Sequence, residues 1–278
     1  MSNDNKTLHG VSDVEAAKAL IDNGADVNAK GSYYDRTPLH HVVGGGVMAK
    51  FLIEHGADVN ARDRLGQTPL HTVDDSLAAK HLIEHGADVN ARDKDENTPL
   101  HMTEWVSVVQ MLLENGADVN AKEFTGRTAL HLVRNPVIAE MLLENGANVN
   151  ARNGDGETPL HLTNKPDVAK LLLEAGAEVN ARDKYGRTPL HFAFDGDLVD
   201  LLLNNGADPM AKSRYSLGSG YPHEFKECEA KTAAYEKALM RQVLQHSDKA
   251  RDAAQEHQRG TGQVNAEPAP TMKRSRRM

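Results

Sequence analysis

The segment "TPLHLTNKPDVAKLLLEAGAEVNARDKYGR" runs from Thr158 to Arg187, and from Thr188 the chain begins nearly the same sequence again. The motif Thr-Pro-Leu-His, or its variant Thr-Ala-Leu-His, starts at Thr37, Thr68, Thr98, Thr128, Thr158 and Thr188. A Gly-Ala pair recurs in step with it, at Gly24, Gly56, Gly86, Gly116, Gly146, Gly176 and Gly206. Together with the weaker match "KTLH" at residues 6–9, the pattern predicts seven units over residues 6–213, with a 30-residue period from Thr68 onward.

Each letter of the motif has a local physical role. Thr can cap a helix, because its hydroxyl accepts a backbone N–H of the first turn. Pro follows at the first helical position, where an N–H would have no partner in any case. His falls at the third helical position, from which a side chain can reach back to the cap. Glu96 stands where the other turns have a glycine such as Gly126, so we expect an altered turn in the fourth unit.

A second helix is predicted in each unit. In "DVAKLLLEAGA" the apolar residues Val168, Leu171 and Leu172 share one helix face, Ala169 leaves room for a neighbouring helix, and Gly176 ends the helix. The following "AEVNARDKYG" is predicted to be an extended crossing that ends in a tight turn. One such unit cannot bury its own apolar face. Stacked copies must therefore form a one-dimensional solenoid in which each unit completes the core of the next.

The motifs "TPLH", "LLLEAGAEVNA" and "DKYGRTPLH" closely resemble the ankyrin repeat, over about three quarters of the chain. This resemblance implies an all-α solenoid in which each unit contributes a β-hairpin and two helices. Ankyrin units usually have about 33 residues, and the three residues missing here fall between the two helices, so the first helix is expected to be short. The short period resembles units that are common in bacterial proteins.

The remainder of the chain is predicted to fall into three further parts. Residues 1–5 are expected to be a disordered N-terminus. Residues 214–258 are expected to be a linker and a helix that caps the seventh unit, or alternatively a free amphipathic helix that binds a partner. Residues 259–278 are expected to be a disordered basic tail. Its cluster Lys273, Arg274, Arg276 and Arg277 is a candidate targeting signal, for nuclear import or bacterial secretion, or simply a solubilising tail.

Charge and cysteine content restrict the class of protein. Residues 1–210 contain 19 Lys+Arg and 32 Asp+Glu, a balance of −13, which disfavours nucleic-acid binding by the array. The single cysteine, Cys228, excludes an internal disulfide and fits a reducing compartment. No secretory signal or membrane span is apparent, so we expect a cytoplasmic monomer. Delivery into a host cell, or into a nucleus, is the alternative location.

The resemblance implies binding to a partner protein through the hairpin tips and the first, inner helices. Residues at these positions vary between units while the framework hardly changes. We predict partner contacts at Tyr33, Tyr34, Leu65, Met102, Phe124, Tyr185 and Phe192. The alternative for each aromatic ring in a tip is that it folds onto its own hairpin. Trp105 precedes an apolar helix and is predicted to fill the core.

The sequence predicts no enzyme, metal site or cofactor site. The motif histidines recur one unit apart, roughly 10 Å in a stack of helices, whereas metal ligands lie about 2 Å from one ion. The resemblance adds asparagine hydroxylation as a side hypothesis for Asn60, Asn90, Asn120, Asn150 and Asn180, whose default role is a hydrogen bond in the hairpin. The leading hypothesis is a protein-interaction scaffold. The alternatives are a secreted bacterial effector that captures a host protein and a regulator or inhibitor of a separate enzyme.

Overall fold

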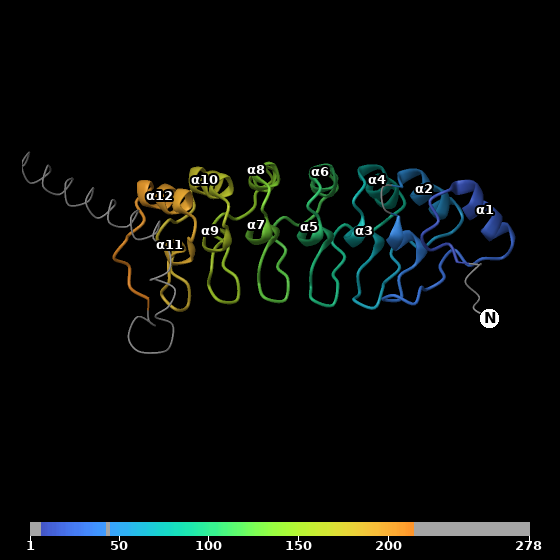
Figure 1. The fold of residues 1–278 in the computed structure, drawn as a ribbon, viewed down its shortest axis with the longest axis horizontal. Coiled ribbons are helices and arrows are strands. Elements are labelled where there is room, and N and C mark those ends of the chain that lie inside the picture. The colour runs from blue at the N-terminus through green and yellow to red at the C-terminus, as the bar shows by residue number, and fades with distance from the viewer. Residues whose placement is uncertain (1–6, 43–44, 214–278) are drawn as a thin grey trace, which may run out of the picture.

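The structure, a computed structural model, describes residues 7–42 and 45–213, which form a single row of repeated units (Figure 1). The short helices, here called inner helices, are η2 (Pro38–His41), α3 (Pro69–Thr72), α5 (Pro99–Met102), α7 (Ala129–Leu132), α9 (Pro159–Leu162) and α11 (Pro189–Phe192). The long helices, here called outer helices, are α1 (Val14–Asp22), α2 (Gly46–Glu54), α4 (Ser76–Glu84), α6 (Val106–Glu114), α8 (Pro136–Glu144), α10 (Pro166–Glu174) and α12 (Gly196–Asn204). Consecutive helices of each class lie side by side, which confirms the solenoid. The predicted N-terminal, capping and tail segments lie outside the described residues.

The capping roles predicted for Thr and His are confirmed in the inner helices. In α9, the Thr158 N–H donates to Nδ1 of His161 over 3.0 Å, and the Thr158 hydroxyl lies 2.8 Å from the same nitrogen. Because a backbone N–H can only donate, Nδ1 is the acceptor and the imidazole proton is on Nε2. That nitrogen donates to the carbonyl of Arg187 in the next unit, over 3.2 Å. The motif histidine thus caps its own helix and also bonds to the next unit. The helix has only four residues, as the short period predicts.

The outer helices all end in the same way. In α10, Gly176 has φ of 89°, the left-handed conformation that suits glycine. Its N–H donates to the carbonyl of Leu173 at 3.0 Å, and the Ala177 N–H donates to that of Leu172 at 2.9 Å. This pair of bonds is the Schellman arrangement, which satisfies carbonyls that the helix end would leave free. The predicted role of the Gly-Ala pair is confirmed.

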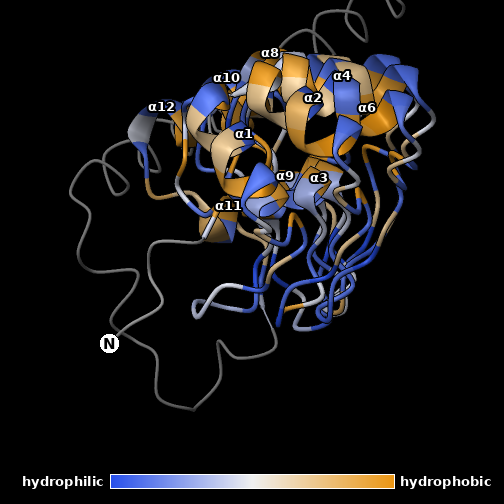
Figure 2. Cartoon of the chain, turned by 90° about the vertical axis from the view of Figure 1, so that its right-hand side faces the viewer, coloured by the Kyte–Doolittle hydropathy of each residue, from blue (hydrophilic) through white to orange (hydrophobic). Residues whose placement is uncertain are grey.

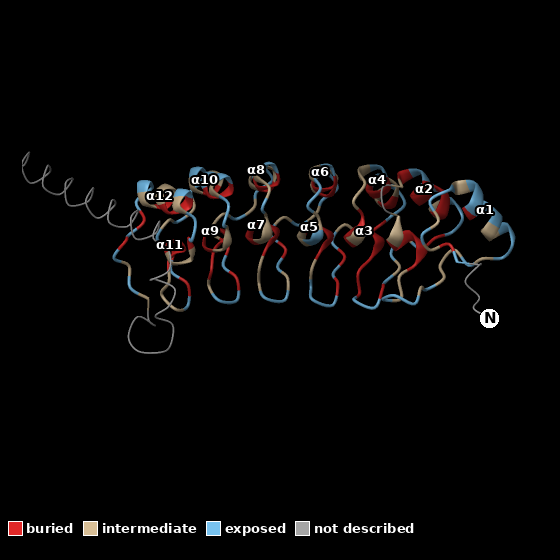
Figure 3. Cartoon of the chain, viewed as in Figure 1, coloured by how far each residue is buried: buried red, intermediate tan, exposed pale blue. Residues whose placement is uncertain are grey.

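The core is built from small and medium aliphatic side chains of neighbouring outer helices, together with the inner-helix leucines. Val168, Ala169 and Leu172 of α10 are fully buried, whereas Leu171 is only half-buried at the edge of the helix. Hydrophobic residues are concentrated in the helices, while the hairpins that project from them are largely hydrophilic (Figure 2). Buried residues line the facing sides of the helices, and exposed ones follow the hairpin ends and the outer surface (Figure 3).

The hairpins are tight turns, and no β-strand forms within residues 7–42 and 45–213. In the fourth unit the Asp93 N–H donates to the carbonyl of Asn97 at 2.9 Å, and the Glu96 N–H donates to that of Asp93 at 3.1 Å. Glu96 adopts φ of 63° and makes the same turn as glycine does in the other units. The expected alteration of this turn is therefore wrong. The turn's own hydrogen bonds hold a non-glycine residue in the left-handed region, at a conformational cost.

Two rows of side chains tie each unit to the next. Asn120 donates through Nδ2 to the Gly146 carbonyl at 3.0 Å and accepts at Oδ1 from the Asn148 N–H at 2.8 Å. Asn28, Asn60, Asn90, Asn150 and Asn180 repeat these bonds in their own units. On the hairpin side, Arg152 donates to the Arg182 carbonyl of the next hairpin at 2.6 Å. The asparagine side chains thus make structural hydrogen bonds, but these join neighbouring units and do not close a hairpin as predicted.

Candidate partner-binding face

Five of the residues predicted to contact a partner lie in hairpin tips, and their exposure differs. Phe124 is 80 % exposed and Tyr33 is 66 % exposed. Leu65 and Tyr34 are borderline, at 39 % and 36 %. Tyr185 is half-buried, so it is less exposed than Phe124 and Tyr33. The tips therefore present at least two apolar rings to solvent, at the second unit and the fifth.

Phe124 projects from a turn whose backbone is fixed on both sides. Its N–H donates to the Asp95 carbonyl of the preceding hairpin at 2.9 Å. The carboxylate of Glu123 accepts from the N–H groups of Thr125 and Arg127, each at 2.9 Å, and from the Thr125 hydroxyl. Burial raises the pKa of Glu123, but these hydrogen bonds outweigh it and hold the pKa below its usual value. A ring on such a rigid turn would lose little conformational entropy on binding a partner.

The tip of the second unit has a different construction. Tyr34 and Asp35 both adopt left-handed backbone conformations, with φ of 54° and 55°, to accommodate the extra residue of this hairpin. The rings of Tyr33 and Tyr34 meet edge to face, with centroids 4.4 Å apart. The Tyr34 carbonyl accepts from the Arg64 N–H at 2.6 Å, so the pair is anchored to the next hairpin. Tyr33 is the freer of the two rings.

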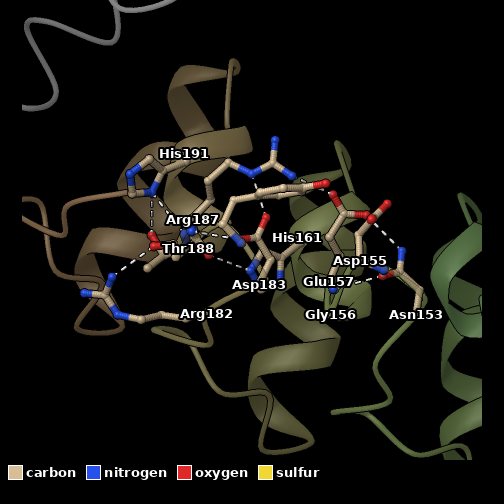
Figure 4. Close-up of polar contacts among 12 residues, drawn as sticks. Asn153, Asp155, Gly156, Glu157, His161, Arg182, Asp183, Arg187, Thr188 and His191 are labelled. Carbon is tan, nitrogen blue, oxygen red and sulfur yellow. Dashed lines mark hydrogen bonds and ion pairs between the residues drawn. The ribbon is translucent and has the colours of Figure 1, made fainter. Parts of the chain in front are cut away.

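The guanidinium of Arg187 lies against the rings of Tyr185 and Phe192. The Arg187 guanidinium carbon lies 5.0 Å from the Tyr185 ring centroid and 4.3 Å from that of Phe192. The guanidinium also donates from Nε to Asp183 at 2.6 Å and from Nη2 to Glu157 at 3.1 Å. Figure 4 shows these carboxylates beside the arginine. For Tyr185 the structure thus favours the alternative in which the ring folds back onto its own hairpin.

On the inner helices, Met102 is 41 % exposed and borders a groove of about 770 Å³ between the fourth and fifth units. The groove is lined by apolar side chains of α5, α7 and α8 and by the polar residues that follow the two inner helices. Trp105 follows the lining residues Thr103 and Glu104 in the sequence and is not itself a lining residue. The prediction that Trp105 fills the core is wrong, because the residue precedes the first turn of α6 and its side chain is 55 % exposed.

Two features of this region were not apparent from the sequence pattern. The residue before the outer helix caps it with its side chain at Asp13, Asp75, Asn135 and Asp195, but not at Gly45, Trp105 or Lys165. Comparing this position between units would have shown that Trp105 lies before the helix and is not part of its apolar face. The second feature is the buried Nε of Arg127, which has no hydrogen-bond partner among the described residues. Whether this nitrogen finds an acceptor depends on contacts between units, which the local sequence does not predict.

The motif histidines are arranged for structure. Burial lowers the pKa of His131 and His161 to about 4, outweighing the hydrogen bonds from their ring nitrogens to the backbone. Burial likewise lowers the pKa of His40, His71 and His101. Across residues 7–42 and 45–213, no three His, Cys, Asp or Glu side chains are grouped so that they could hold a metal ion. In the same residues no helix has the length and apolar character needed to span a membrane.

Comparison with known proteins agrees with this geometry. A family model described as ankyrin repeats in three copies matches residues 8–93, 72–153 and 133–213. The chain belongs to the ankyrin-repeat family. Among solved structures, the array is similar to the ankyrin repeat domain of Bcl-3, described as a unique member of the IkappaB protein family. That similarity has a TM-score of 0.54 and 29 % identity, and it covers 68 % of this chain and 93 % of the other. No curated protein sequence matches.

Ankyrin repeats as a class mediate protein–protein interaction, so the exposed residues described above are candidates for contact with a partner. The candidate targeting residues Lys273, Arg274, Arg276 and Arg277 lie outside the described residues, as does Cys228. The asparagines named for hydroxylation have both ends of their side-chain amides engaged with the next unit, as Asn120 illustrates.

Proposed function

We propose that this ankyrin array is a non-enzymatic scaffold that holds a partner protein against its hairpin tips and inner helices. The observation that carries the proposal is the exposed ring of Phe124 on a turn fixed by hydrogen bonds on both sides. Exposed aromatic side chains on a rigid frame are typical interface anchors. Tyr33 and Met102 extend the same face toward the second unit and toward the inner helices, and Tyr34, Leu65, Tyr185 and Phe192 flank it.

The experiment is affinity capture from lysate with the full-length chain and two matched variants. The tip variant replaces Tyr33, Tyr34, Phe124 and Tyr185 with Ser. The control variant replaces two exposed apolar residues of the outer helices, Val47 and Val137, with Ser. Circular dichroism checks that both variants keep the helical array.

We expect the tip variant to lose a specific partner, with affinity reduced by at least about tenfold, and the control to retain it. Retention by the tip variant together with loss by the control would show that the wrong face has been assigned. The captured protein also separates the narrower alternatives. A host protein would indicate an effector, and an enzyme from the protein's own cell would indicate a regulator or inhibitor.

A further inference from the structure

The seventh unit departs from the repeat at two positions that are polar in the units before it. Met210 takes the place of the asparagine that joins each earlier unit to the next, the last of which is Asn180. Phe194, two residues after α11, stands where the third to sixth units have a polar residue: Asp74, Glu104, Arg134 and Asn164. Met210 is 62 % exposed and Phe194 is 60 % exposed. The last unit therefore presents apolar side chains where its neighbours have polar ones.

The position of Met210 in the repeat shows which way this surface faces. Asn180 donates from Nδ2 to the Gly206 carbonyl at 2.8 Å and accepts at Oδ1 from the Asp208 N–H at 2.7 Å. Residues at this position therefore point toward the next unit. α11 and α12 stand at the end of the row of described units (Figure 1), so Met210 faces outward along the array. We call this surface of the seventh unit, which includes Phe194, Met210 and the adjoining side of α12, the end face.

Phe194 and α12 also border the place that an eighth unit would occupy. Glu104, which holds the position of Phe194 in the fourth unit, lines the groove shared with the fifth unit. Glu140, which holds the position of Asp200 in α8, lines the shallow gap between α8 and α10. In the seventh unit both positions adjoin the end of the described array, because α12 packs on α10 and α11 and is the last outer helix of the described residues.

The end face is also acidic. Asp197 and Asp200 are the only charged residues of α12, and neither makes an ion pair within the described part of the chain. In α10, by contrast, Lys170 stands at the position of Asp200 and pairs with Glu174. A solenoid is kept soluble by polar outer faces on its terminal units, whereas this array ends in exposed apolar side chains beside unpaired carboxylates. Such a surface suits an amphipathic helix with basic residues at the edge of its apolar face.

The chain that continues from the end face contains such a segment. Within residues 223–258, apolar and aromatic residues recur at spacings of three, seven, four and four, which place them on one face of a predicted helix: Phe225, Cys228, Tyr235, Leu239 and Val243. Lys231 precedes Tyr235 by four residues, at the edge of that predicted face. The described array ends at residue 213, and the nine residues 214–222 can span at most about 30 Å. The segment is therefore tethered beside the end face, where its effective concentration is high.

We infer that residues 223–258 form an amphipathic helix that docks on the end face of the same chain, with its apolar side chains against Phe194 and Met210 and with Lys231 beside Asp200. The contact buries apolar surface that a further unit would otherwise cover. It leaves the hairpin tips open, so it does not depend on the proposed scaffold function. A helix that instead binds a partner protein, and an end face that is covered by a second copy of the chain, would each give a different experimental result.

Cys228, the single cysteine of the chain, supplies the probe because it belongs to the apolar face of the segment. Docking shields its thiol from a maleimide, whereas a free helix leaves the thiol accessible. In the full-length chain at fixed pH, we expect Cys228 to react at least about tenfold more slowly than in the urea-unfolded chain. The double variant Phe194→Asn, Met210→Asn should restore most of the unfolded rate. Asparagine occurs at both positions in the sixth unit, as Asn164 and Asn180, so the array should keep its fold, which circular dichroism checks.

Two single variants test the contact further. Asp200→Lys supplies the residue that α10 has at this position, Lys170, and should speed the reaction about threefold by repelling Lys231. Val47→Asn is the matched control, because Val47 is an apolar residue of α2 that is 66 % exposed near the other end of the array, and it should leave the rate unchanged.

Three results would overturn the inference. Reaction of the native chain at the unfolded rate would show that the segment is free to bind a partner. Slow reaction that persists in the double variant would place the segment elsewhere on the array. Protection that increases with protein concentration would mean that a second copy covers the end face. None of these results bears on the scaffold function, which is tested separately at the hairpin tips.

Discussion

Acidification should destabilise the array through its buried motif histidines. His131 and His161 each accept a backbone N–H at Nδ1 and donate from Nε2 to the next unit. A protonated imidazole has no acceptor nitrogen, so protonation removes the bond from Thr at the start of the helix. Burial also disfavours the charged imidazole and lowers the pKa of both side chains to about 4.

The magnitude follows from the difference between the folded and unfolded pKa values. Above about pH 7.5 the histidines are neutral in both the folded and the unfolded state, so they impose almost no pH dependence. Between about pH 7.5 and about pH 4 the unfolded chain binds more protons than the folded one, so the free energy of unfolding falls as the pH falls. From about pH 7.5 to about pH 5.5 the loss is roughly 1 to 2 kcal/mol per histidine, or about 3 kcal/mol for the pair. Because whole domains are stable by only about 5–15 kcal/mol, this loss is readily measured.

The assay is urea unfolding followed by circular dichroism at the two pH values, on the wild type and on the double variant His131→Gln, His161→Gln. Gln at the third helical position is a capping-box residue, but it does not titrate. The double variant should be less stable at neutral pH, because it loses the donors to the next unit. Its stability should nevertheless fall by about 3 kcal/mol less on acidification. Equal losses in the two proteins would refute the reasoning.

The remaining predictions concern local stability. Asn120→Ala removes two bonds between units and should lower the free energy of unfolding by about 1–2 kcal/mol in urea titrations, whereas an unchanged midpoint would show that water replaces both bonds. Glu96→Gly places glycine at a left-handed backbone position and should raise the free energy of unfolding by about 1 kcal/mol, and with it the thermal midpoint. A lower midpoint would show that Glu96 is not strained. Trp105→Asp and Lys165→Asp should each raise the free energy of unfolding by about 1 kcal/mol, because each supplies a helix cap. If neither variant is more stable in urea titrations, these helix starts need no cap.

Much of the frame could be predicted from the sequence because each repeated residue has a local role. The Thr–His pair, the glycine after each outer helix and the Val-Ala-Leu face act within one unit or on its immediate neighbour. Their spacing therefore fixes the helices and the direction of stacking. A motif that recurs in step also separates framework positions from variable ones, which is how Phe124 and Met102 were recognised as candidates for partner contact.

The rest depends on side chains that meet across units, where the local pattern carries no information. Trp105 has apolar neighbours in sequence, yet it stands one residue before the helix and is exposed there. Glu96 breaks the glycine pattern, yet the hydrogen bonds of the turn hold it in the glycine conformation. The Nε of Arg127 has no hydrogen-bond partner among the described residues, whereas the Nε of Arg187, at the same position two units later, donates to Asp183. Each case is decided by competition between neighbouring groups, and only three-dimensional placement shows the outcome.

The asparagine row also bears on how the array responds to tension. Each link joins one unit only to the next, so a load applied at the two ends passes through every junction in series and no bond spans the whole length. We expect the junctions to rupture one after another, each releasing a unit of 30 residues, or roughly 100 Å of chain. In an optical trap, the extension trace would show a series of nearly equal steps, one for each unit that unfolds.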